Sequence, residues 1–275
     1  MATFALAVAA FKGCFRNWRL WLLQFFVNPL LFGLFTLWLL IPVANAFHIT
    51  LNILAAVLLL AAFLVLHAGT LNYFYSQSGN EAAPLRKAFA SALRNLLPVA
   101  LCAVVLYLLF LLASSARAYT DTLPPFLRSM MPAFLRRQVG LSLIQGMFDD
   151  FLFALRWVIM PGLVLPFLAS ASHFGFRGLG RRGFAAWKLT VFSVSYWGLL
   201  PLAALVGIFA TQKIMDMTPD FRTSTFAWET TSVIFRTFVS YLLGLCAWML
   251  VCSVVGRHGG KFEDAASDLS RQTGV

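Results

Sequence analysis

The sequence predicts an all-α fold, a polytopic transmembrane helical bundle with six spans. Three observations predict it: the composition, six long apolar stretches, and an uneven distribution of basic residues between them. The chain has 275 residues, of which 60% are hydrophobic and 11% are charged, and its mean hydropathy is +0.81. A soluble domain holds about 45–50% apolar and about 25% charged residues. This excess of apolar side chains indicates a lipid environment.

Six apolar stretches are long enough to cross a hydrocarbon core, which takes about 20 helical residues. They run from Leu20 to Val43, Ile49 to Phe74, Leu97 to Ala113, Phe151 to Phe174, Leu189 to Phe209 and Val233 to Val255. The first is too long for the apolar part of a secretory signal, about 7–15 residues, so we expect a retained span. We expect one transmembrane domain over residues 1–256 and a cytoplasmic tail over 257–275.

Basic residues divide unevenly between the two sides of the expected bundle. Thirteen Lys and Arg residues fall on the side that holds both termini and six on the other, while Arg156 and Arg236 lie within spans. Cytoplasmic loops carry the Lys and Arg excess, so we expect both termini to be cytoplasmic in a bacterial-type inner (plasma) membrane. Nucleic acid is not an expected partner, because its binders group basic residues on a polar face.

A basic amphipathic segment precedes each pair of spans. Phe11, Phe15, Arg16 and Asn17 match Phe89, Leu93, Arg94 and Asn95, and a third copy surrounds Phe184, Trp187 and Lys188. We predict three parallel repeats of an interfacial helix plus a transmembrane hairpin, over about 1–78, 79–174 and 175–256. The cations Lys12, Arg16, Arg19 and Arg94 are expected to contact anionic lipid headgroups. The alternative is that these segments are the cytoplasmic ends of longer spans.

The Arg16-Asn17 and Arg94-Asn95 pairs, each standing before paired spans, carry a resemblance. They resemble bacterial six-helix integral membrane families of unknown function that are related to the membrane region of glycerophosphodiester phosphodiesterases. The resemblance is architectural and implies a helical membrane bundle. It transfers no activity, because the phosphodiesterase chemistry of those relatives resides in a separate soluble domain.

A few ionisable residues lie where lipid disfavours them. They are His67 in the second span, Arg156 and Arg236 in the fourth and sixth, and Asp149, Asp150 and Glu229 before these arginines. An ionisable residue inside a span is by default a functional hypothesis, although His67 would serve packing equally well. We expect Arg156 to pair with Glu229, and Arg236 with Asp149 or Asp150. The alternative is that each arginine extends to nearby headgroups.

Two connecting segments have a recognisable character. The segment from Ser114 to Phe148 sets apolar residues among Arg128, Arg136 and Arg137, which is amphipathic and predicts an exoplasmic interfacial helix broken at Pro132. Four glycines, Gly175, Gly178, Gly180 and Gly183, predict a flexible cytoplasmic loop.

No catalytic motif stands out in the sequence. P-loop, zinc-protease and nucleophile-elbow patterns are absent, so we expect no enzyme activity, no metal and no cofactor. The expected function is a non-enzymatic transport-related, lipid-handling or scaffolding component. One alternative is a small-solute or lipid transporter with a path near the fourth span, which Pro161 and Pro166 interrupt. The other is a lipid-modifying membrane enzyme. Homo-oligomers and hetero-oligomers both stay open.

Overall fold

The computed structural model describes Val8 and residues 12–15, 17–42, 44–76, 84–217 and 226–273; of Arg182 and residues 261–273 only the helical backbone is described. Over these residues the regular structure is entirely helical. Six helical rods are long and apolar enough to cross a membrane: Trp18–Leu39, Ala46–Ser76, Leu96–Tyr119, Leu141–Leu179, Val194–Asp216 and Phe226–Gly260. The predicted all-α class is confirmed, and so are six helices that are long and apolar enough to span a membrane.

The first half of the chain contains the first three rods, with shorter helices before and after the third. The helices are α2 (Trp18–Leu39), α3 (Ala46–Ser76), α4 (Leu85–Arg94), α5 (Leu96–Ser115), the short η1 (Ala116–Tyr119), α6 (Leu123–Met130) and α7 (Ala133–Gln138). The break between α6 and α7 falls at Met131 and Pro132, both with extended backbone, as predicted. Proline lacks an amide hydrogen, so it starts α7 more readily than it continues α6.

The second half contains the fourth to sixth rods. They comprise α8 (Leu141–Ala154), η2 (Leu155–Ile159), α9 (Met160–Phe174), η3 (Gly175–Leu179), α10 (Arg181–Val191), α11 (Val194–Ala204), η4 (Leu205–Ala210), α12 (Thr211–Asp216) and α13 (Phe226–Thr273). The fourth rod begins at Leu141 rather than at Phe151, and the fifth begins at Val194 rather than at Leu189. Both η2 and η4 are wider π-helical turns.

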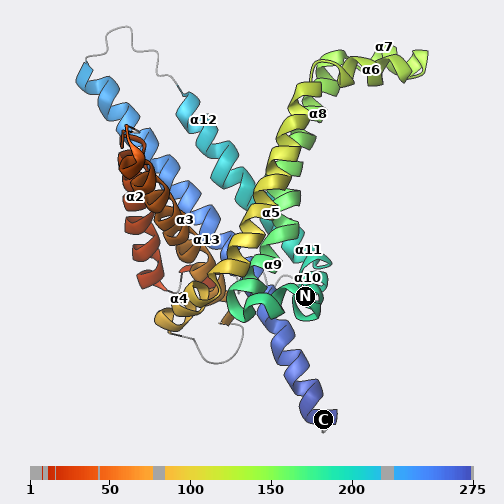
Figure 1. Ribbon diagram of the computed structural model, residues 1–275. Coiled ribbons are helices and arrows are strands. Elements are labelled where there is room, and N and C mark those ends of the chain that lie inside the picture. Colours follow the sequence, from red (N-terminus) through yellow and green to blue (C-terminus); the bar gives the residue numbers. More distant parts are fainter. Residues whose placement is uncertain are drawn as a thin grey trace.

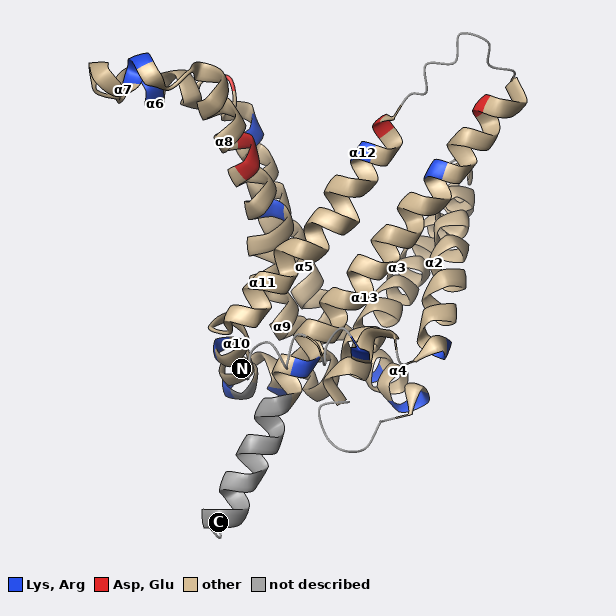
Figure 2. Ribbon diagram, turned by 180° about the vertical axis from the view of Figure 1, so that it is seen from behind, with Lys and Arg blue, Asp and Glu red and all other residues tan. Residues whose placement is uncertain are grey.

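The rods converge at one end and diverge at the other (Figure 1). We call the converging end, where α4, η3 and α10 lie, the basic end, and the other the open end. At the open end, α2, α3 and α13 form one arm, α5 and α8 form a second, and α12 lies between them. Lys and Arg gather at the basic end, whereas the described Asp and Glu lie towards the open end (Figure 2).

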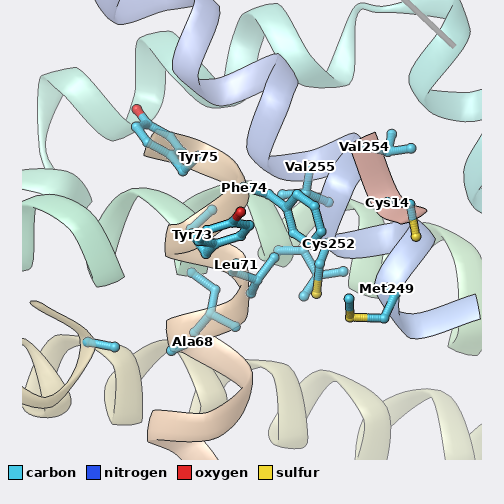
Figure 3. Close-up of a cluster of buried hydrophobic side chains, with 14 of the residues drawn as sticks. Cys14, Ala68, Leu71, Tyr73, Phe74, Tyr75, Met249, Cys252, Val254 and Val255 are labelled. Carbon is cyan, nitrogen blue, oxygen red and sulfur yellow. The ribbon is translucent and has the colours of Figure 1, made fainter. Parts of the chain in front are cut away.

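The tightest packing lies at the basic end, between α3 and α13. Leu71 and Phe74 of α3 are buried against Met249, Cys252 and Val255 of α13 (Figure 3). A Cβ atom on Gly256 would lie 2.6 Å from the backbone of Phe74, and one on Gly259 would lie 2.5 Å from the ring of Tyr75. Small residues permit such close helix contact, which drives association where lipid removes the hydrophobic effect.

One expectation about the connecting segments changes. The glycine-rich segment is not a flexible loop: it forms η3, where Gly175 has a φ of +65° and a Cβ on Gly178 would lie 2.3 Å from the Ser170 oxygen. The glycines therefore allow the backbone of η3 to pack closely against α9. The chain after Gly256 continues α13, with His258 buried. Of the first amphipathic segment, the structure describes Val8, residues 12–15 and the chain from Asn17 on, whereas Phe4, Phe11 and Arg16 fall outside the described residues.

Candidate functional site: an apolar groove between three helices

A groove of about 970 Å³ lies between α2, α3 and α13, in their open-end halves. Its walls are almost wholly apolar, with Leu31, Phe32 and Phe35 from α2, Ala56, Leu60 and Phe63 from α3, and Val233, Ile234 and Phe238 from α13. Each helix contributes residues three or four apart, such as Leu31 and Phe35 or Ile234 and Phe238, which lie on one face. The three helices therefore turn one apolar face each towards a common space.

Polar side chains close the groove where the three helices meet. Gln24 of α2 is 0% exposed and donates from Nε2 to Thr70 Oγ1 of α3 at 2.5 Å. Asn28 donates to Gln24 Oε1 at 2.7 Å, and the Tyr241 hydroxyl of α13 donates to the Phe25 oxygen at 2.8 Å. Such bonds between helices fix their positions in a membrane. They hold the helices together below the groove, so that the space above stays open.

His67 lies one helical turn beyond Phe63, on the basic-end side of the groove. Its ring packs edge-on against Phe63, with centroids 4.2 Å apart, and against Trp248 of α13 at 5.0 Å. Both ring nitrogens of His67 and the Nε1 atom of Trp248 are buried. None of these three atoms has a hydrogen-bond partner within the described chain. Two neighbouring rings beside the groove thus carry three buried polar atoms with unused hydrogen-bonding capacity among the described residues.

The two arginines within spans do not form the expected cross-pairs. The Arg156 guanidinium carbon lies 4.6 Å from the ring centroid of Phe110 on α5, and its Nε has no hydrogen-bond partner in the described part of the chain. Arg236 donates to the backbone oxygens of Met217 and, at 3.3 Å, of Met215.

The divergence of the helices keeps these residues apart. Asp149 and Asp150 are exposed on α8, in the arm that diverges from α13 (Figure 1). Arg156 of the α8–α9 rod is therefore not paired with Glu229 of α13, nor Arg236 of α13 with either aspartate. The structure also does not bring His67, Arg156 and Arg236 together, because each contacts a different neighbour.

Polar residues at three helix starts form contacts that the sequence did not predict. Asn17, before α2, donates to the Tyr73 hydroxyl of α3. Asn95, before α5, donates to the Ser172 oxygen of α9 at 3.1 Å. Ser193, before α11, lies 3.1 Å from His258 Nε2 of α13. We call these three the joint residues. The recurring Asn was visible in the sequence, but its partners were not.

Two tryptophans follow joint residues by four positions and bond back to the preceding segment. Trp21 Nε1 donates to the Cys14 oxygen at 2.7 Å, and Trp197 Nε1 donates to the Val191 oxygen at 2.6 Å. The last carbonyls of a helix lack intrahelical partners, so these indoles satisfy groups that lipid would leave unpaired. Each bond fixes the angle between a short helix and the span that follows it.

The predicted basic residues Lys12, Arg19 and Arg94 are exposed, while Arg16 lies outside the described residues. No group of three or more His, Cys, Asp or Glu residues arranged to hold a metal ion occurs in the described ranges. Comparisons of the chain with protein-family models, with curated proteins and with solved structures give no match.

Proposed function

We propose that the protein is a non-enzymatic membrane protein that handles lipid by holding lipid chains in the groove between α2, α3 and α13. The observation that carries this proposal is the groove itself, with about 970 Å³ of space and apolar walls. Binding sites for small hydrophobic ligands typically hold about 300–1,000 Å³ and combine apolar walls with few polar groups. Asn28 and Tyr241 supply those polar groups at one end, and the buried Gln24 accepts a hydrogen bond from Asn28.

The proposed orientation places the basic end in the cytoplasm, with both termini on that side of a bacterial-type inner membrane. The gathering of Lys and Arg around α4 and α10 supports it (Figure 2), because cytoplasmic segments carry the Lys and Arg excess. Exposed Arg19 and Arg94 then face anionic lipid headgroups, each contributing about 1 kcal/mol near the surface. The helices α6 and α7 lie on the exoplasmic side in this orientation.

The same orientation accommodates three parallel repeats, each made of a short helix followed by a transmembrane hairpin. The joint residues support this arrangement, because each contacts the second helix of its own hairpin: Asn17 contacts α3, Asn95 contacts α9 and Ser193 contacts α13. Trp21 and Trp197 add a second shared contact in the first and third units. In the second unit the equivalent position is Val99, which is buried.

A lipid transporter is the second candidate, and the two π-helical turns favour it. The turn η2 ends two residues before Pro161, which has no amide hydrogen to continue the helical ladder, and η4 lies in the neighbouring fifth rod. Single π-helical turns inside α-helices are frequent at functional sites. In this alternative, the fourth and fifth rods move relative to each other while a lipid chain occupies the groove.

Native mass spectrometry of the protein released from lipid nanodiscs tests the proposal. Replacing Ala56 with Trp fills the groove and is expected to remove retained lipid, because Ala56 is a small residue in its wall. Val104→Trp is the matched control, since Val104 is exposed on α5 outside the groove. Equal lipid retention by wild type, Ala56→Trp and Val104→Trp contradicts the proposal.

A further inference from the structure

We propose that His67 and Trp248 form a binding site, at the closed end of the groove, for the protonated carboxyl group of a long-chain fatty acid whose alkyl chain occupies the groove. This inference rests on the proposed lipid-handling function and deepens it, because it names the class of lipid and the atoms that recognise it.

The position of the two side chains connects them to the groove. His67 continues the α3 stripe of Leu60 and Phe63, one turn nearer the basic end, and Trp248 continues the α13 stripe two turns beyond Tyr241. The rings of His67 and Trp248 lie 5.0 Å apart, one from each helix. The two rings therefore lie between α3 and α13 on the basic-end side of the groove, just beyond the residues that line it.

Their polar atoms have no other task in the described chain. His67 Nδ1, His67 Nε2 and Trp248 Nε1 are buried without a hydrogen-bond partner among the described residues. An unsatisfied polar group in a membrane interior is strongly unfavourable, so such groups normally find a partner. Edge-on contact between the two rings lets an N–H group face a π surface, but it leaves the acceptor nitrogen of the imidazole unused.

The hydrogen-bonding pattern selects the head group. A neutral imidazole offers one donor and one acceptor, and an indole offers one donor. A protonated carboxyl group complements this set, because its carbonyl oxygen accepts from the indole and its hydroxyl donates to the imidazole. A neutral carboxyl group is also the form that an apolar environment favours.

A phospholipid head group does not fit the same place. The residues lining the groove, as far as the structure describes them, include no Lys or Arg to neutralise a phosphate. The His67 ring is enclosed by Phe63 and Trp248, which limits the head to a few atoms. The bound acid lies with its carboxyl group towards the basic end and its chain towards the open end, as a lipid of the basic-end leaflet does.

Phe63 covers the site from the groove side. Its ring lies 4.2 Å from that of His67 and is 50% exposed, so it has room to rotate. Binding requires Phe63 to turn aside and let the carboxyl group reach the imidazole. Phe63→Ala is therefore expected to increase fatty-acid binding, whereas a purely structural role for His67 predicts only lower stability in this variant.

Photolabelling of the protein in lipid nanodiscs tests the inference. The probes are palmitic acid and phosphatidylcholine carrying the same diazirine in the chain, and the readout is the adducts on α3 and α13. His67→Leu and Trp248→Phe should each need about fivefold more palmitic acid for half-labelling, equivalent to about 1 kcal/mol for one hydrogen bond between helices. Phosphatidylcholine labelling should stay unchanged, which also reports that the variants fold.

Two control variants on the same helices show whether the effect is specific to the site. His48→Leu on α3 and Trp228→Phe on α13 remove the same groups from the same helices away from the groove, and they should behave as wild type. Unchanged palmitic acid labelling in His67→Leu and Trp248→Phe, with phosphatidylcholine still reaching the groove, overturns this inference alone. If neither probe labels the groove, the proposed function fails with it.

Discussion

The side-chain amide of Asn95 donates a hydrogen bond of 3.1 Å to the backbone oxygen of Ser172, 77 residues further along the chain. Asn95 marks the start of α5, and Ser172 lies in the last turn of α9. The bond therefore joins the basic ends of two antiparallel helices and satisfies a carbonyl group that has no partner within its own helix. The Ser91 hydroxyl donates to the same Ser172 oxygen at 3.1 Å.

Replacing Asn95 with Leu should weaken the α5–α9 hairpin. We expect a loss of about 1 kcal/mol in the free energy of unfolding, the typical size of one hydrogen bond between membrane helices. Unfolding in mixed detergent micelles with increasing sodium dodecyl sulfate measures it. Ser129→Ala is the control, because the exposed Ser129 hydroxyl bonds only within its own helix. Equal losses in the two variants would contradict a special role for Asn95.

Replacing Gly256 with Ala should force α3 and α13 apart. The new Cβ would lie 2.6 Å from Phe74, and such overpacking costs about 1–3 kcal/mol. Gly244→Ala, in the same helix, meets nothing within 4 Å and should leave stability unchanged or slightly raised, since Ala favours helices over Gly by about 1 kcal/mol. Thermal unfolding in detergent separates the two. A Gly256→Ala protein as stable as Gly244→Ala would mean that the helices do not approach this closely.

Arg156 should be coupled to Phe110 and not to Glu229. Its guanidinium lies over the Phe110 ring at 4.6 Å, and cation–π pairs contribute about 0.5–1 kcal/mol at exposed sites and more when desolvated. A double-mutant cycle with Arg156→Met and Phe110→Leu should give a coupling of that size. A cycle with Arg156→Glu and Glu229→Arg should give none. Rescue of Arg156→Glu by Glu229→Arg would show that the two arms close together in the membrane.

Cys14 should resist alkylation in the folded protein. Burial, with a smaller contribution from Cys246, raises the pKa of the Cys14 thiol from 9.0 to about 12. Each pKa unit lowers the reactive thiolate tenfold below the pKa, so at pH 8 the thiolate falls about a thousandfold. We expect iodoacetamide to modify a single-cysteine Cys14 protein far more slowly than a cysteine placed at exposed Ser115. Comparable rates would indicate that the segment holding Cys14 detaches from α13.

Much of the fold followed from composition and length, because a hydrocarbon core imposes about 20 apolar residues on each span. The limits of the fourth and fifth spans did not. The apolar stretch begins at Phe151, but a helix continues beyond the lipid as long as nothing breaks it, and the fourth rod starts at Leu141. The separation of α10 from α11 at Ser193 carried only a weak signal, a single serine among helix-compatible residues.

The site was harder to predict because it depends on which helices are neighbours. His67 stood out as an ionisable residue in a span. Its contact with Trp248, a residue 181 positions further along the chain, could not be read from local patterns. The expected Arg156–Glu229 pair failed for the same reason, since matching positions in two spans do not place those spans side by side. The glycines of η3 resembled a flexible loop because sequence does not show the backbone that packs against them.

The most direct test of the account is a cryo-electron microscopy structure of the protein in lipid nanodiscs, at a resolution that shows alkyl chains. The account predicts an elongated density in the groove, bounded by Leu60 and Phe63 of α3 and Phe238 of α13. Two results would contradict the proposed lipid groove. One is that side chains of α2 and α13 meet across the groove and leave no space, and the other is that a second protein chain fills it.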